Sequence, residues 1–79
     1  MRPITEVRAG PVVLATILRM GNGHPATPVR YHVAWTEIAA RLGAPAIAPT
    51  RYRPEAEAMV MLWATPRMAH APAVHLLRR

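Results

Sequence analysis

The sequence contains no lysine, aspartate, serine, glutamine, cysteine or phenylalanine in its 79 residues. Without cysteine, no disulfide can form and the thiolate ligands of structural zinc sites are missing, which excludes two common sources of stability in small domains. Without serine, cysteine, aspartate or lysine, the commonest catalytic nucleophiles are absent as well. We therefore expect a protein that is not an enzyme, with no catalytic residues and no cofactor.

The remaining polar residues do not form a recognisable metal or catalytic motif. No two of the histidines have the i,i+2 or i,i+4 spacing that places a pair of ligands on one face of a strand or helix. Glu55 and Glu57 are two residues apart, which puts them on different sides of a helix rather than side by side. We expect no metal site among the histidines, which are His24, His32, His70 and His75.

The length indicates one domain over residues 1–79. A domain of this size buries only about 60% of the surface that its unfolded chain exposes, so its core must be efficient or be completed by a partner, such as a second copy. The apolar run Val12–Leu18 is followed directly by Arg19 and is far shorter than the roughly 20 residues of a membrane helix. We expect a cytoplasmic protein that does not contact membranes.

The charge of the chain is one-sided. All ten positive charges are arginines, opposed by four glutamates, and the net charge is +6. Arginine binds phosphate and carboxylate groups through paired hydrogen bonds, so such a surface suits nucleic acid or an acidic protein surface. The codons of arginine, alanine and proline are rich in G and C, so genome composition alone would also explain arginine in place of lysine.

A β-hairpin is predicted from residue 12 to residue 35. Residues Val12–Met20 are rich in β-branched side chains and run into Gly21-Asn22-Gly23, a strong turn signal. In Val29–Trp35 apolar and polar residues alternate with the period of two that is typical of a half-buried strand. A helix between Pro11 and Gly21 is the less favoured alternative for the first segment.

A short helix is predicted over Thr36–Gly43. Thr36 can cap its start and Gly43 can adopt the left-handed conformation at its end. Glu37 and Arg41 have the i,i+4 spacing of a helical ion pair.

Residues 35–44 resemble the first helix and turn of helix-turn-helix DNA-binding domains, with the turn glycine at Gly43. In that family a recognition helix follows the turn at once. Here Pro45 and Pro49 occupy that region and cannot lie inside a regular helix. The resemblance therefore implies DNA binding only if the loop around Arg51–Arg53 takes the place of the missing helix.

The C-terminal part allows two interpretations. Residues 44–53 are predicted to be a loop, and a second helix is predicted from Pro54, which favours the first turn. In the alternative, Met59–Thr65 is a strand that pairs with a final strand over Val74–Arg79, and periodicity does not separate the two for so short an apolar run. The predicted class is α+β: an N-terminal β-hairpin, a short helix, and a C-terminal helix or second hairpin.

The candidate binding residues are basic and aromatic. Tyr31 is expected in the core, because it shares a strand face with Val33 and Trp35. Arg19 is assigned to a strand end and Arg41 to a helix end. The residues left to bind nucleic acid are Arg30, Arg51, Tyr52, Arg53, Arg78 and Arg79.

These residues predict a small nucleic-acid-binding protein, with a regulatory role as one option, whose arginines contact phosphates. The alternative is a protein interaction module, such as an inhibitor, adaptor or assembly subunit, whose arginines meet an acidic partner surface. In that alternative an adaptable apolar cluster would complete the contact, formed by Met59, Met61, Leu62, Trp63 and Met68.

Overall fold

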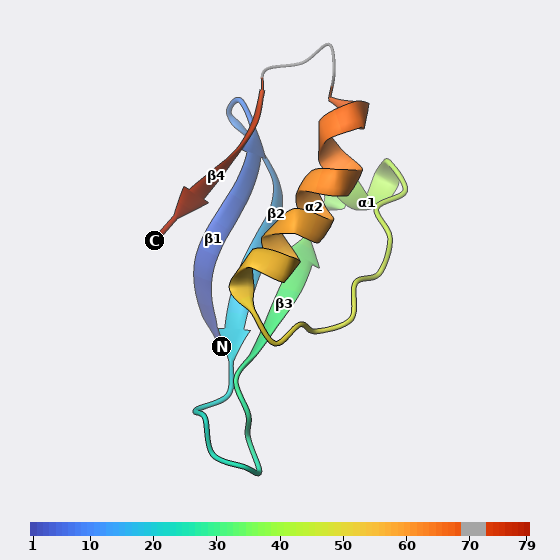
Figure 1. Cartoon of the computed structure of the whole chain (residues 1–79). Coiled ribbons are helices and arrows are strands. Elements are labelled where there is room, and N and C mark those ends of the chain that lie inside the picture. The colour runs from blue at the N-terminus through green and yellow to red at the C-terminus, as the bar shows by residue number, and fades with distance from the viewer. Residues whose placement is uncertain (69–72) are drawn as a thin grey trace.

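The computed structural model describes residues 1–68 and 73–79. They form an antiparallel sheet of four strands in the order β3-β2-β1-β4, together with two helices (Figure 1). The predicted α+β class is confirmed, but the arrangement differs from the prediction at both ends of the chain. The elements are β1 (Arg2–Ala9), β2 (Val12–Met20), β3 (Arg30–Trp35), α1 (Glu37–Arg41), α2 (Arg53–Arg67) and β4 (Val74–Arg78).

The predicted hairpin is formed by β2 and β3, whose register places Met20 opposite Arg30. The helical alternative for the first of these segments is wrong. Gly21, which begins the connection, has a φ of 87°. A Cβ atom there would collide with the carbonyl oxygen of Pro28. This turn therefore requires glycine, both for its backbone conformation and for the space.

Strand β1 was missed, because we expected no element before residue 12. It lies between β2 and β4 in the sheet. Its register against β2 shifts between Pro3 and Thr5, next to a proline that has no N–H to donate to the ladder. At this shift Ile4 and Thr5 are consecutive and both buried. Two adjacent buried residues break the alternation by which a strand is recognised in a sequence.

Helix α1 is the predicted short helix. Thr36 caps it by accepting a hydrogen bond from the N–H of Ala39 at 3.5 Å, and Gly43 follows its end with a φ of 86°. The Thr36 hydroxyl also lies 2.9 Å from the carbonyl oxygen of Val13, to which it donates. The same side chain therefore caps the helix and ties it to β2.

The C-terminal part combines the two predicted alternatives. Helix α2 runs from Arg53 to Arg67, so a strand over Met59–Thr65 is wrong, and Arg53 begins the helix instead of ending the loop. The final strand, which only the hairpin alternative contained, exists as β4 and pairs with β1. His70 and residues 69–72 of the turn predicted over 69–73 in the second hairpin lie outside the described residues. Pro54 and Glu55 in the first turn favour the helix.

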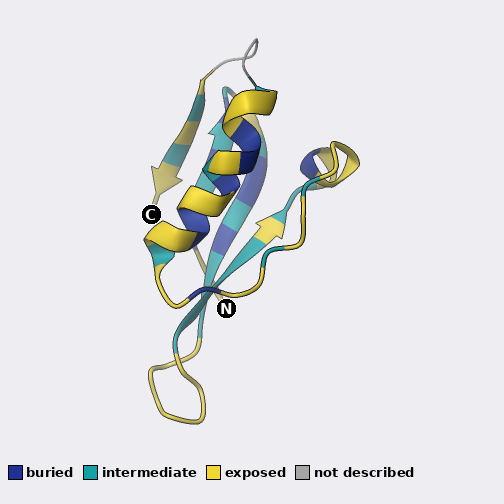
Figure 2. Ribbon diagram, turned by 45° about the vertical axis from the view of Figure 1, so that its right-hand side comes forward, coloured by how far each residue is buried: buried dark blue, intermediate teal, exposed yellow. Residues whose placement is uncertain are grey.

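Helix α2 lies along one face of the sheet, and its buried positions face the strands (Figure 2). Tyr31, Val33 and Trp35 pack against this core, as predicted for the alternating strand. Among the described residues, no helix is both long and apolar enough to cross a bilayer. The main buried cluster contains Ile4, Val7, Ala15, Ile17, Ala56 and Val60.

Candidate functional site

The arginines fall into two groups according to what their guanidinium groups contact. One group is bonded within the protein. Arg8 and Arg79 both contact Glu6, and Arg41 contacts Glu37. Arg30 donates to the carbonyl oxygen of Val29 at 2.8 Å. Arg67 donates to that of Trp63 at 2.9 Å and lies 4.9 Å from the centre of the indole ring. These contacts give each side chain a structural role.

Glu57 is the most buried carboxylate in the described part of the chain, with only 3% of the residue exposed. It accepts hydrogen bonds from the Thr5 hydroxyl at 2.9 Å and from two nitrogens of Arg78 at 2.8 and 3.1 Å. The hydrogen bond from Arg78 is the main cause that lowers the pKa of Glu57, against the opposing effect of burial. The carboxylate thus joins α2 to β1 and β4. We call Glu6, Glu57 and their partners Arg8, Arg78 and Arg79 the carboxylate network.

The second group has no carboxylate or carbonyl partner within residues 1–68 and 73–79. It consists of Arg2, Arg19, Arg51 and Arg53. All but Arg51 line one cavity of about 410 Å³. We call this cavity, with all its lining residues, the arginine pocket; they are Arg2, Ile4, Arg19, Tyr31, Tyr52, Arg53 and Pro54.

The sheet register assembles one side of the arginine pocket. Arg2 of β1 lies opposite Arg19 of β2, and Arg19 lies opposite Tyr31 of β3. Residues that are directly opposite in neighbouring strands point to the same face, so these three side chains form a row across the sheet. The face is the one covered by α2, because Tyr31 packs against the core beneath that helix.

The start of α2 supplies the other side of the pocket. Tyr31 and Thr50 exchange two backbone hydrogen bonds, of 2.8 and 3.0 Å. This bridge holds the chain just before Tyr52 and Arg53 against the edge strand β3. In Figures 1 and 2 the first turn of α2 lies close to the N-terminal end of β1, where Arg2 is located. Tyr52 is 62% exposed and stands at the rim.

The structure separates the predicted binding residues. Tyr52 and Arg53 line the arginine pocket, and Arg51 is exposed beside them without lining it. Arg30 is bonded to its neighbour's carbonyl group, as described above. Arg78 and Arg79 belong to the carboxylate network. The predicted residues thus do not form one site.

Sequence reasoning missed two arginines of the pocket, Arg2 and Arg19. Arg2 lies in the strand that was not predicted, and Arg19 was assigned to a strand end. One signal was available: Arg19 is two residues from Ile17 in the predicted strand. Residues two apart in a strand point to the same face, so Arg19 could have been assigned to the face of Ile17. Its partner across the sheet could not be determined without β1.

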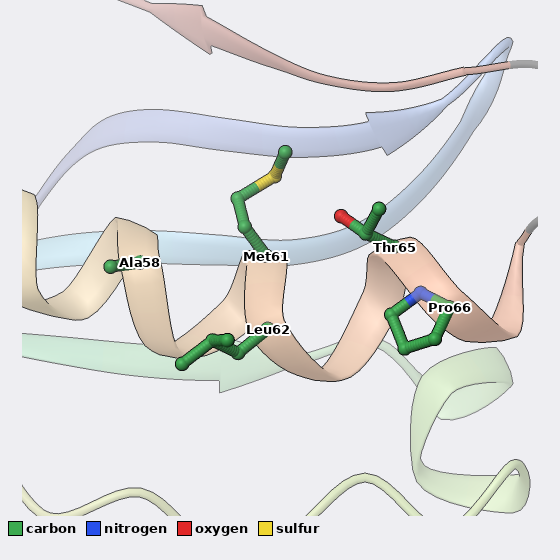
Figure 3. Close-up of a pocket in the computed structure, with 5 residues that line it drawn as sticks. All are labelled: Ala58, Met61, Leu62, Thr65 and Pro66. Atoms are coloured by element: carbon green, nitrogen blue, oxygen red, sulfur yellow. The ribbon is translucent and has the colours of Figure 1, made fainter.

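Two apolar cavities lie elsewhere. One, of about 520 Å³, runs along α2 and is lined by Ala58, Met61, Leu62, Thr65 and Pro66 (Figure 3). The other, of about 320 Å³, is lined by Ala9, Pro11, Val12, Leu14, Ile38, Leu42 and Met68. Leu62 is 76% exposed, whereas Trp63, which was predicted to join an apolar contact surface, is buried and packs edge-on against Trp35.

The described chain is therefore a small α+β protein in which one helix covers an antiparallel sheet and an arginine-lined cavity opens where that helix begins. No protein-family model matches it, and we found no match among curated proteins or solved structures.

Proposed function

We propose that this protein binds nucleic acid, with phosphates held in the arginine pocket. The observation that carries the proposal is the convergence of Arg2, Arg19 and Arg53 on one cavity in which no described carboxylate is bonded to them. Like charges that are held together repel one another, and an anion that enters the cavity relieves this repulsion. Guanidinium groups bind phosphate oxygens through paired hydrogen bonds.

The aromatic residues favour nucleic acid over other anions. Tyr52 stands exposed at the rim, and a tyrosine ring can stack on a base of any sequence when that base is unpaired. Arg51, exposed next to it, is available for a neighbouring phosphate. The combination of a cationic cavity and an adjacent ring is suited to a single strand more than to a duplex, whose bases are stacked on one another.

The test is a fluorescence anisotropy titration of a short labelled single strand at several salt concentrations. If the three arginines together neutralise between one and three negative charges of the strand, the logarithm of the affinity should fall with the logarithm of salt concentration with a slope between about −0.7 and about −2. The control variant Arg41→Gln removes one positive charge outside the pocket. Because Arg41 is paired with Glu37, this variant should leave the slope unchanged. Absence of binding at low salt would refute the proposal.

A second candidate is a protein interaction module, and it is favoured by the exposure of Leu62, which lines the apolar cavity on α2. Exposed apolar surface next to polar groups is a feature of protein interfaces. Sedimentation equilibrium would test the case in which the partner is a second copy. A homodimer that Leu62→Glu dissociates would support this candidate, and a monomer at all concentrations would count against self-association.

A further inference from the structure

The charge in the arginine pocket exceeds what one internal phosphate needs. A phosphodiester inside a strand carries a single negative charge and two free oxygens. A terminal phosphate monoester carries about 1.5 to 2 negative charges at neutral pH and three strong acceptor oxygens. Arg2, Arg19 and Arg53 line the same cavity, so three guanidinium groups are available to one phosphate. Three such cations match the charge and the acceptors of a monoester better than those of a diester.

The shape of the pocket also suits the end of a strand. Its sheet side is closed, because Ile4 is only 3% exposed and Tyr31 packs against the core. Its volume of about 410 Å³ lies within the range of about 300 to 1,000 Å³ that is typical of sites for one small ligand. A terminal phosphate can reach this closed side at the end of a chain, whereas an internal phosphate brings chain on both of its sides to the cavity.

From the rim of the cavity outward, Tyr52 and then Arg51 follow in the order in which a bound strand would present its first base and its next phosphate. Tyr52 lies at the rim and offers its ring to the first base. Arg51 precedes it in the chain and is exposed, away from the cavity. A terminal phosphate in the pocket would therefore place the first base near Tyr52 and the next phosphate within the field of Arg51.

The geometry points to a terminal phosphate monoester of a single-stranded nucleic acid as the ligand of the pocket made by Arg2, Arg19 and Arg53. This inference rests on the proposed function and narrows it. The monoester is at either the 5′ or the 3′ end of the strand, since the chemical group is the same at both, and the experiment separates the two.

Three oligonucleotides of one sequence with an internal dye test the inference: one with a 5′-phosphate, one with a 3′-phosphate and one with hydroxyl groups at both ends. We expect one phosphorylated strand to bind about tenfold more tightly than the hydroxyl strand, which corresponds to one additional charge-assisted contact. The preference should disappear in Arg19→Gln and Arg53→Gln and persist in Arg41→Gln. It should also shrink between about pH 7.5 and about pH 5.5, because the second pKa of a phosphate monoester is near 6.

The two proposals fail differently. Equal affinity for all three strands, with a steep dependence on salt, would overturn the terminal-phosphate inference and leave nucleic-acid binding in place. Lack of binding to all three strands at low salt would overturn both. A phosphate preference that survives Arg19→Gln and Arg53→Gln would place the terminal phosphate outside this pocket and overturn the inference as well.

Discussion

The arginine pocket and the carboxylate network lie next to each other and use the same cation for different purposes. Arg53 and Glu57 are one turn apart on α2, yet the carboxylate is bonded to Arg78 from β4. The charge of Arg53 makes the smallest of the contributions that lower the pKa of Glu57. The position of each carboxylate therefore decides which arginines are bonded within the protein and which are available to a ligand. The net charge of the chain counts both groups alike and does not distinguish them.

The largest effect expected from this comparison is a loss of binding when the pocket is neutralised. The double variant Arg19→Gln with Arg53→Gln should lower the affinity for a single strand on the order of 100-fold, since each charge-assisted contact is worth about 1.5 kcal/mol or more. Anisotropy titration at fixed salt measures it.

The matched control removes the same charge elsewhere, through Arg41→Gln with Arg67→Gln. Both of these arginines have protein partners, so this variant should retain most of the affinity. Equal losses in the two double variants would mean that net charge alone drives binding, and the distinction between the two groups of arginines would be lost.

The next effect concerns stability and belongs to the carboxylate network. Glu57→Gln keeps the shape of the side chain but removes the charge that Arg78 and Thr5 contact. We expect the free energy of unfolding to fall by about 2 kcal/mol, because a buried charge-assisted network is weakened. Urea denaturation measures it. Glu55→Gln, at an exposed site on the same helix, should leave the midpoint almost unchanged; identical midpoints for the two variants would contradict the prediction.

A smaller effect should appear on acidification. The pKa of Glu57 is lowered from 4.5, mainly by the hydrogen bond from Arg78, and that of Glu6 is lowered mainly by the hydrogen bond from Arg8. The unfolded chain thus takes up protons at higher pH than the folded chain. The stabilisation is complete above about pH 4.5 and is lost as the pH falls through the folded pKa values.

Urea denaturation between about pH 7 and about pH 3 tests this, and Glu57→Gln should flatten the profile. A profile of the wild type that rises toward acid pH would show that the two carboxylates are not stabilising in the folded state.

The smallest effect is expected at Arg78 and Arg79, two residues that were predicted from the sequence to bind nucleic acid. Arg78→Gln with Arg79→Gln should change the affinity for a single strand by no more than about threefold, because both guanidinium groups are already paired with carboxylates. Titration at a temperature where circular dichroism shows the variant to be folded measures it. A loss as large as that of the pocket variant would mean that these ion pairs open when nucleic acid binds.

Local patterns allowed part of this structure to be predicted. The β2–β3 hairpin, α1 and the start of α2 each depend on turn glycines, caps or a proline within a few residues. Strand β1 did not follow from such patterns, because the register shift at Pro3 disrupts its alternation. Of the pocket residues, only Tyr52 and Arg53 were predicted to bind a ligand, and these two are neighbours in the sequence. The other arginines of the pocket come together through strand register, which joins residues far apart in the sequence.

The pairing of β1 with β4 has a consequence for how the chain folds. Thr5 lies opposite Arg78, so this contact must close a loop of nearly the whole chain, whereas the β1–β2 and β2–β3 pairs close short loops. Loop closure of this length is slow, and we expect β4 to dock last. Until it does, β1 presents an unpaired strand edge, the kind of surface on which partly folded chains associate. Refolding should therefore be most vulnerable to aggregation in the interval before the C-terminal strand arrives.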